Sequence, residues 1–182
     1  MKLKNYEFKA STNDLDRLEQ KLLELHPVFI GVDHQVDTYF NVTDGRLKLR
    51  EGNIENALIY YERPDTPGAK QADIILYKHN PERSLKDILI KVHGIKAVVD
   101  KTRKIYFIGN VKFHFDTVNE LGTFIEVEAI DETGNIGFKK LKEQCNRYFF
   151  FFGLKESDLV DKSYCDLIFK RSAPFKGRPL YI

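Results

Sequence analysis

Pairs of like charge, spaced two residues apart, are the most informative chemical feature of this sequence. The pairs are Glu126 and Glu128, Lys48 and Arg50, and Lys101 and Arg103. Residues two apart on a β-strand project to the same face. Neighbouring carboxylates repel each other and call for a divalent cation, since hard cations take carboxylate oxygens. Neighbouring Lys and Arg call for a polyanion such as phosphate. A metal-complexed triphosphate would satisfy both groups at once.

Two further strands carry polar residues on one face only. Glu7 and Lys9 share a face, as do His114 and Asp116, while Phe residues occupy the opposite faces. This alternation is compatible with an open sheet that has one solvated, charged face. Like-sign pairs argue against that reading, because a solvated face usually mixes signs. A closed sheet with the charges inside and amphipathic helices outside fits the pattern better.

The elements that must position these residues can be read from periodicity and turn signals. Eight strands are predicted, at 4–10, 36–41, 46–51, 57–63, 72–78, 97–108, 111–117 and 123–130. Thr43-Asp44-Gly45 and Gly109-Asn110 are typical of hairpin turns. Three helices are predicted, at about 15–25, 80–94 and 136–153, each with an apolar stripe. The expected fold class is α+β: a closed eight-stranded antiparallel β-barrel, or tunnel, with helices packed outside.

Composition narrows the function classes. The 182 residues suit one domain, and a net charge of +2 gives no general attraction to DNA, RNA or an acidic membrane. No segment approaches the ~20 apolar residues of a membrane span. Cys145 and Cys165 lie far apart and lack zinc-site spacing, so we expect reduced thiols in a cytoplasmic protein. A homodimer is compatible with the sequence.

Several motifs, in order, resemble the CYTH or triphosphate tunnel superfamily, which includes class IV adenylyl cyclases and thiamine, inorganic and RNA triphosphatases. Residues 5–9 resemble its E-x-E-x-K opening, and residues 101–103 resemble its K-x-R strand. Residues 115–128 are similar to the D-x-V…L-G-x-F-x-E-x-E block, and residues 163–167 resemble the closing S-Y-x-D-L. Residues 60–65 are similar to the class IV cyclase-like branch. The resemblance runs from Lys4 to about Lys170, so we expect one domain at 1–170 and a tail at 171–182.

The resemblance implies a role for each matching residue in a tunnel open at both ends. The implied ligands of Mg²⁺ or Mn²⁺ are Glu7, Glu126 and Glu128. The implied phosphate-binding residues are Lys9, Lys48, Arg50, Arg63, Lys101 and Arg103. Lys9 and Asp116 are the candidate catalytic residues. Asn5 departs from the family pattern, which has Glu there and would supply a charge.

Three functions follow from these expectations. The first is a class IV-type adenylyl cyclase that converts ATP to cyclic AMP and pyrophosphate. The second is a thiamine or inorganic triphosphatase that hydrolyses the terminal phosphate, and the third is a non-catalytic nucleotide or polyphosphate binder. In each case the crowded basic residues should repel one another in an empty tunnel. Arg103→Ala is therefore expected to leave the stability of the empty protein unchanged or raised.

Overall fold

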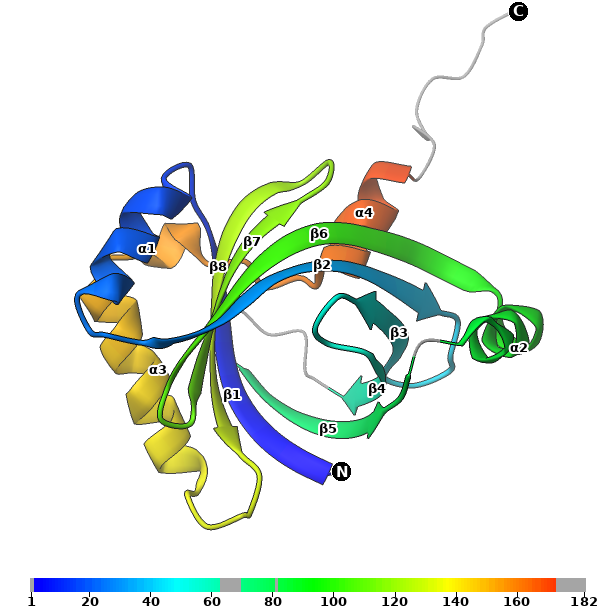
Figure 1. Ribbon diagram of the computed structural model, residues 1–182, viewed down its shortest axis with the longest axis horizontal. Helices are drawn as coiled ribbons and strands as arrows, with labels where there is room; N and C mark the ends of the chain where they lie inside the picture. The colour runs from blue at the N-terminus through cyan, green and yellow to red at the C-terminus, as the bar shows by residue number, and fades with distance from the viewer. Residues whose placement is uncertain (1, 63–69, 81, 173–182) are drawn as a thin grey trace, which may run out of the picture.

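Eight antiparallel strands close into a barrel in the computed structural model, which describes residues 2–62, 70–80 and 82–172 (Figure 1). The strands are β1 (Lys2–Ser11), β2 (Val28–Phe40), β3 (Arg46–Gly52), β4 (Ala57–Glu62), β5 (Lys70–Lys78), β6 (Ile95–Ile108), β7 (Val111–Val118) and β8 (Gly122–Asp131). The helices are α1 (Leu15–Leu23), α2 (Arg83–His93), α3 (Phe138–Phe152), the short 3₁₀ helix η1 (Glu156–Asp158) and α4 (Tyr164–Ser172). The strand order is β1-β5-β4-β3-β2-β6-β7-β8, and β8 pairs back to β1. The predicted α+β barrel is confirmed.

Helices α1 and α3 cover the outer face of β1, β7 and β8, on the left in Figure 1. Phe113 and Val127 on the strands pack with Leu22, Leu141 and Phe152 on the helices, and all five are almost fully buried. Burial of such side chains drives the sheet to keep this face outward against the helices. Because strand residues alternate, the intervening charged residues then point into the barrel.

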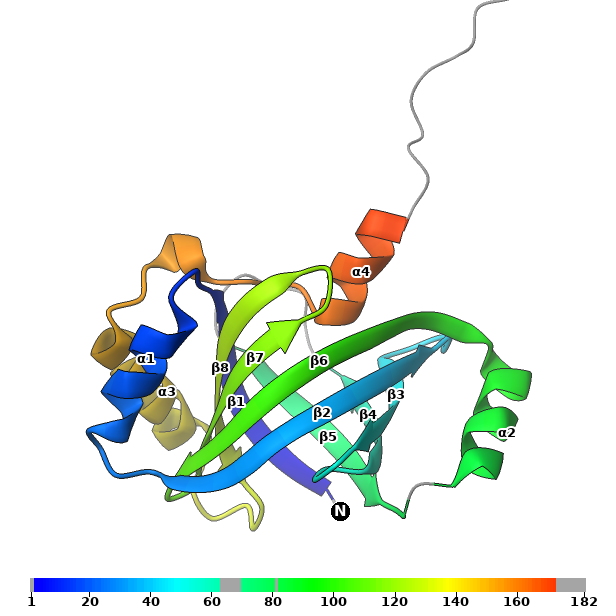
Figure 2. The same cartoon turned by 45° about the horizontal axis from the view of Figure 1, so that its top comes forward.

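The two remaining α-helices pack at other parts of the barrel. Leu89 of α2 packs with Phe40 and Leu49 of β2 and β3, and Figure 2 shows α2 beyond the ends of these strands. Helix α4 packs along β6, and its Tyr164 joins a cluster that includes Phe124 of β8. Helix α4 therefore brings a residue of the C-terminal segment to the barrel interior.

Two elements differ from the sequence-based expectation. Helix α4 is a fourth α-helix, whereas the pattern predicts three. Ser163 and Asp166 form a reciprocal cap at its start, with Ser163 Oγ accepting from the Asp166 amide at 3.1 Å, and this S-x-x-D spacing was a usable signal. Strand β2 begins at Val28 rather than Val36. Its first half carries exposed Val28 and Phe29, and a bulge near Gly31 breaks the alternation.

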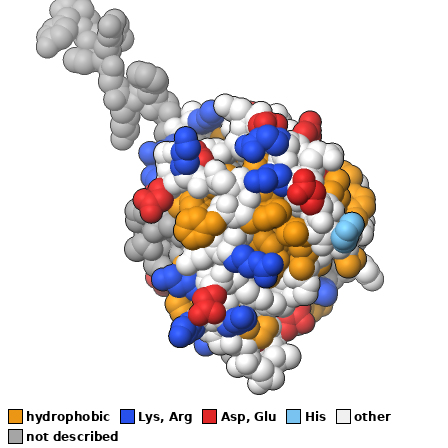
Figure 3. All heavy atoms as spheres, turned by 90° about the vertical axis from the view of Figure 1, so that its left-hand side faces the viewer, with side chains coloured by type: hydrophobic (Ala, Val, Ile, Leu, Met, Phe, Trp, Pro, Cys, Tyr) orange, Lys and Arg blue, Asp and Glu red, His pale blue; other side chains and the backbone are white. Residues whose placement is uncertain are grey.

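The face formed by α1 and α3 mixes apolar and charged side chains (Figure 3). Leu23, Phe138 and Phe150 are exposed large apolar residues on these two helices. No helix within the described ranges has the length and apolar character needed to cross a membrane. Isolated exposed apolar residues of this kind are normal on a folded domain.

Candidate active site

The barrel encloses a cavity of about 550 Å³ to which all eight strands contribute side chains. The predicted site residues that line it are Glu7, Lys9, Lys48, Arg50, Lys101, Arg103, Glu126 and Glu128. Strand register explains their grouping: Glu7 lies opposite Glu128, and Lys9 lies opposite Glu126. Arg63, also predicted to bind phosphate, lies outside the described residues. Strand pairing together with the alternation of side chains thus brings together residues far apart in the sequence, such as Glu7 and Glu128, which are 121 positions apart.

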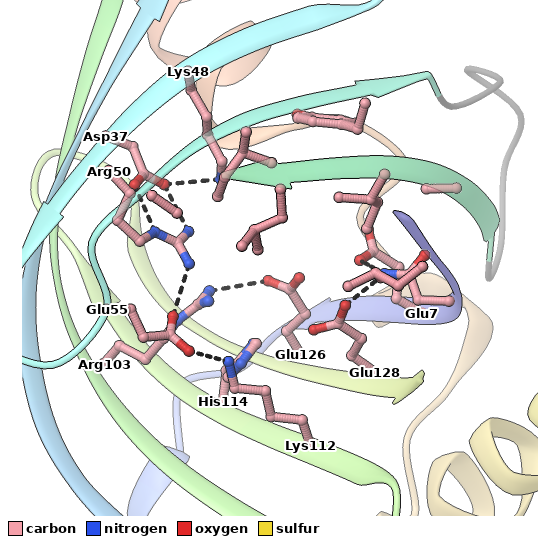
Figure 4. A pocket seen from close by; sticks show the side chains of 18 of the residues that line it. Glu7, Asp37, Lys48, Arg50, Glu55, Arg103, Lys112, His114, Glu126 and Glu128 are labelled. Carbon is pink, nitrogen blue, oxygen red and sulfur yellow. Dashed lines mark hydrogen bonds and ion pairs between the residues drawn. The ribbon is translucent and has the colours of Figure 1, made fainter. Parts of the chain in front are cut away.

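A buried carboxylate organises three of the basic residues. Asp37 of β2 is 1% exposed and accepts hydrogen bonds from Lys48 at 3.0 Å, from Arg50 at 2.8 and 2.9 Å and from Lys101 at 2.8 Å. Burial alone would raise the pKa of Asp37, but Arg50 and Lys101 outweigh burial and hold that pKa well below its usual range. Asp37 therefore remains an anion that holds Lys48, Arg50 and Lys101 in place, the first two of which are labelled in Figure 4. Sequence reasoning overlooked it, although the hairpin register sets Asp37 opposite Arg50.

A second ion pair fixes Arg103. Its guanidinium donates to both carboxylate oxygens of Asp116, at 2.6 and 2.5 Å, and to Glu126 at 3.2 Å. Tyr164 donates its hydroxyl to Asp116 at 2.8 Å. Asp116, predicted to be catalytic, is fully buried behind Arg103 and orients it. The expectation that Arg103→Ala relieves repulsion among crowded cations overlooks this pairing: removing Arg103 would strand the Asp116 carboxylate in the interior and should destabilise the empty protein.

Burial weakens the charge of both lysines in the Asp37 group, because it lowers the pKa of Lys48 as well as that of Lys101. Lys101 is 1% exposed, and burial lowers its pKa to about 7 despite the nearby Asp37. Arg50 and Arg103 add to this lowering by like-charge repulsion. Lys101 is therefore the cavity cation whose charge state changes most readily near neutral pH, and an anion bound beside it would favour the charged form.

The acidic residues gather on β1 and β8. Asn5 donates its amide to Glu128 at 2.6 Å and to Glu7 at 3.2 Å, so it bridges the two carboxylates. Burial, aided by the charges of Glu7 and Glu126, raises the pKa of Glu128 to about 7. The Asn5 amide oxygen is buried and has no hydrogen-bond partner. A positive charge placed beside Glu128 would favour its ionised form and oppose this rise in pKa.

These acidic residues match the donor chemistry of a hard divalent cation. Glu7, Glu126 and Glu128 offer carboxylate oxygens, and the unpartnered Asn5 oxygen adds an amide donor. As they stand, no three His, Cys, Asp or Glu side chains of the described ranges are gathered closely enough to hold a metal. The neutral Asn5 amide instead donates its N–H groups to two of these carboxylates. The donor set has the chemistry of a site for a hard divalent cation.

Three more polar residues line the cavity. Lys112 of β7 and Glu55 of the loop 53–56 form an ion pair, and sequence reasoning missed both. Lys112 shares a strand face with His114, which was a usable signal, whereas Glu55 lies in a loop without periodicity. His114 is 2% exposed, and neither ring nitrogen has a hydrogen-bond partner. Burial, together with Arg103 and Lys112, lowers the pKa of His114 well below its usual range.

Comparison with known proteins agrees with this geometry. Residues 3–163 match the CYTH domain. The chain belongs to the CYTH domain family. A Methanocaldococcus jannaschii protein, provisionally named an adenylate cyclase, is 27% identical to this CYTH chain over 88% of it and 96% of the relative.

Two solved structures share the CYTH fold with this chain. A Pyrococcus horikoshii protein is 26% identical, with a TM-score of 0.76 over 92% of this chain and 99% of the other. A Hippeastrum protein, provisionally named an adenylyl cyclase and described as having a dominant triphosphatase activity, is 10% identical. Its TM-score is 0.63 over 93% of this chain and 95% of the other, a likeness that shows the fold alone.

Proposed function

We propose that this CYTH protein is a metal-dependent enzyme that binds an organic triphosphate inside its barrel and converts ATP to cyclic AMP and pyrophosphate. The observation that carries the proposal is the division of one cavity into a basic group, an acidic group and an apolar wall. Each group suits one part of a metal–nucleotide complex. The name of the M. jannaschii relative supports the same reaction.

The basic group suits the phosphates. Lys48, Arg50 and Lys101 are held by Asp37, and Arg103 is held by Asp116, so their donors are positioned before any ligand arrives. Preorganised cations stabilise a polyanion without the cost of ordering flexible side chains at the moment of binding. Such positioning is most of what an enzyme must supply for phosphoryl chemistry.

The apolar wall suits an organic group. Ile59 of β4 and Ile74 and Leu76 of β5 line the cavity beside the charged residues, together with Ala57 and Ala72 of the same strands. Tripolyphosphate is charged along its whole length and would set oxygens against this wall without partners. A nucleotide would instead bury its base there. The wall therefore favours a nucleoside triphosphate over an inorganic one.

We assign the metal to the acidic group. Glu7, Glu126 and Glu128 would hold Mg²⁺ or Mn²⁺, with Asn5 as a neutral donor. The bound cation would neutralise phosphate charge and polarise the phosphorus under attack. Removing negative charge from this group, as Asn5 does relative to the family pattern, leaves the three glutamates to supply the whole charge of the site.

The reaction itself needs no covalent intermediate. The ribose 3′-oxygen bonds to the α-phosphorus, the bond from that phosphorus to the bridging oxygen breaks, and pyrophosphate leaves with the electron pair. The hydroxyl proton passes to water. Lys9 lies over the Tyr164 ring at 4.1 Å and contacts the Lys162 carbonyl at 3.4 Å, which presents its ammonium as a point charge for the phosphates. Asp116 acts as a positioning residue through Arg103.

A substrate panel tests the proposal. Purified protein is incubated with ATP, thiamine triphosphate or tripolyphosphate, each with Mg²⁺ or Mn²⁺, and cyclic AMP and orthophosphate are measured separately. We expect cyclic AMP from ATP, with no product after chelation of the metal. Orthophosphate without cyclic AMP would instead identify a triphosphatase, and tight binding without either product would identify a binder. Lys101→Met is the matched inactive control, because it removes a cavity cation and leaves the outer core intact.

A further inference from the structure

Glu55 extends into the cavity from the loop 53–56, which joins β3 to β4. Its carboxylate lies between two basic side chains, Arg50 of β3 and Lys112 of β7 (Figure 4). One oxygen accepts from Arg50 at 2.9 Å, and the other forms an ion pair with Lys112. Strands β2 and β6 separate β3 from β7 in the barrel. The Glu55 carboxylate therefore links two strands that do not pair with each other.

The loop is built so that the backbone of Glu55 stays at the rim of the cavity. Asp33 is fully buried and accepts from the backbone nitrogens of Ile54 at 2.9 Å and Glu55 at 3.0 Å. The Asn56 side chain both accepts from and donates to the backbone of Gly52, at 2.9 Å each. A Cβ on Gly52 would lie 2.7 Å from the Asp33 carboxylate. These contacts hold the loop backbone, so that the Glu55 carboxylate can leave Arg50, Lys112 and Gln35, which donates to it at 3.1 Å, by rotation of its side chain alone.

The position of the Glu55 carboxylate is one that suits an anionic ligand. Burial would raise the pKa of Glu55, but Lys112 and Arg50 outweigh it and hold that pKa far below its usual range, so the side chain is an anion. The Glu55 side chain is more exposed than that of Asp37, the other buried carboxylate that pairs with Arg50. The Asp37 side chain is 2% exposed and sealed within a strand, whereas the Glu55 side chain is 27% exposed. Glu55 can therefore leave its partners for solvent at a smaller cost than Asp37 can.

We propose that Glu55 is an internal competitor of the substrate: it pairs with Arg50 and Lys112 in the empty barrel and is displaced when the triphosphate binds. The inference rests on the proposed function in taking a triphosphate as the ligand. A triphosphate anchored at Lys101 and Arg103 meets Arg50 at a high effective concentration, which allows it to replace a single carboxylate. Glu55 thus compensates the charges of Arg50 and Lys112 in the empty cavity and lowers the affinity for the substrate.

Isothermal titration calorimetry with tripolyphosphate, in the absence of metal, tests this on wild type, Glu55→Gln and Glu51→Gln. Glu51 is a matched control, because its side chain is 29% exposed and pairs with a Lys, Lys86, at 2.6 Å, but it does not line the cavity. We expect Glu55→Gln to tighten tripolyphosphate binding about tenfold, the size of one charge-assisted contact, and Glu51→Gln to leave it unchanged. The ligand-free Tm of Glu55→Gln should fall, and its rise on adding tripolyphosphate should exceed that of wild type.

Equal or weaker tripolyphosphate binding by folded Glu55→Gln, with wild type binding normally, would overturn the inference and leave the proposed function standing. Glu55→Ala serves as a second variant if the first does not fold, since the backbone contacts with Asp33 remain. Failure of all these proteins to bind tripolyphosphate or ATP, both without metal and with Mg²⁺ or Mn²⁺ added, would overturn the proposed function and this inference together.

Discussion

Replacing Asp37 with Asn should destabilise the ligand-free protein strongly. The carboxylate is 1% exposed and accepts hydrogen bonds from Lys48, Arg50 and Lys101. An amide keeps the shape but removes the charge and sets its N–H group against cationic donors. Removing one partner from a buried ion pair costs about 3–5 kcal/mol. For a domain of this size, that loss corresponds to a fall in Tm of about 6–20 °C.

Urea unfolding followed by far-UV circular dichroism measures the loss, because the chain has no Trp for fluorescence. The control is Glu51→Gln, whose pair with Lys86 is partly exposed and should be worth less than about 1 kcal/mol. The loss in Asp37→Asn should be larger at pH 6 than at pH 8. At pH 6, Lys101 of the wild type is charged, and its attraction to Asp37 stabilises the wild type but not the variant. At pH 8, Lys101 is mostly neutral in both proteins, because burial lowers its pKa to about 7, so its pair with Asp37 no longer contributes to the difference in stability.

A loss below about 1 kcal/mol at pH 6, with the m-value unchanged, would refute the reasoning. It would mean that Asp37 does not hold the three cations in solution. A saturating tripolyphosphate concentration should restore much of the stability of Asp37→Asn, since the ligand supplies the missing negative charge.

Three further predictions concern the cavity. Glu128→Gln should keep the fold and weaken Mg²⁺ or Mn²⁺ binding about tenfold or more in calorimetry with a nonhydrolysable ATP analogue, and equal affinity would show that Glu128 does not hold the cation. Wild-type affinity for tripolyphosphate should fall as the pH rises from about 7 to about 9, because binding favours charged Lys101 while burial sets its free pKa at about 7. Lys101→Met should lose that slope, and a slope that persists would assign it to another group. Tyr164→Phe should lower the free energy of unfolding by about 1 kcal/mol, since Asp116 loses one hydrogen bond but keeps Arg103, and an unchanged urea midpoint would contradict the contact.

Much of the barrel could be predicted from local sequence. The alternation of Glu126 and Glu128 with Ile125 and Val127 determines which side chains share a face, because the period of a strand is fixed by backbone geometry. Turn residues such as Gly109, with φ of +58°, determine where the chain reverses. The sequence pattern places the start of strand β2 too late, because exposed apolar residues in its first half hide the alternation. It does not predict helix α4, because Ser163 and Asp166 were interpreted only as part of a family motif and not as a helix cap.

The partners of the charged residues were decided by the tertiary structure. Lys101 meets Asp37, 64 positions away, and Asn5 meets Glu128, 123 positions away, because strand order and register set each pair diagonally across two neighbouring strands. Local sequence therefore determined that the charged side chains face the barrel interior. It did not determine that Lys48, Arg50 and Lys101 all form ion pairs with Asp37. Glu55 is the extreme case, since a loop has no period and its placement depends on the Asp33 carboxylate of another strand. Which charged side chains meet depends on the order in which the strands pair around the barrel. That order depends on how the whole core packs and not on any single segment.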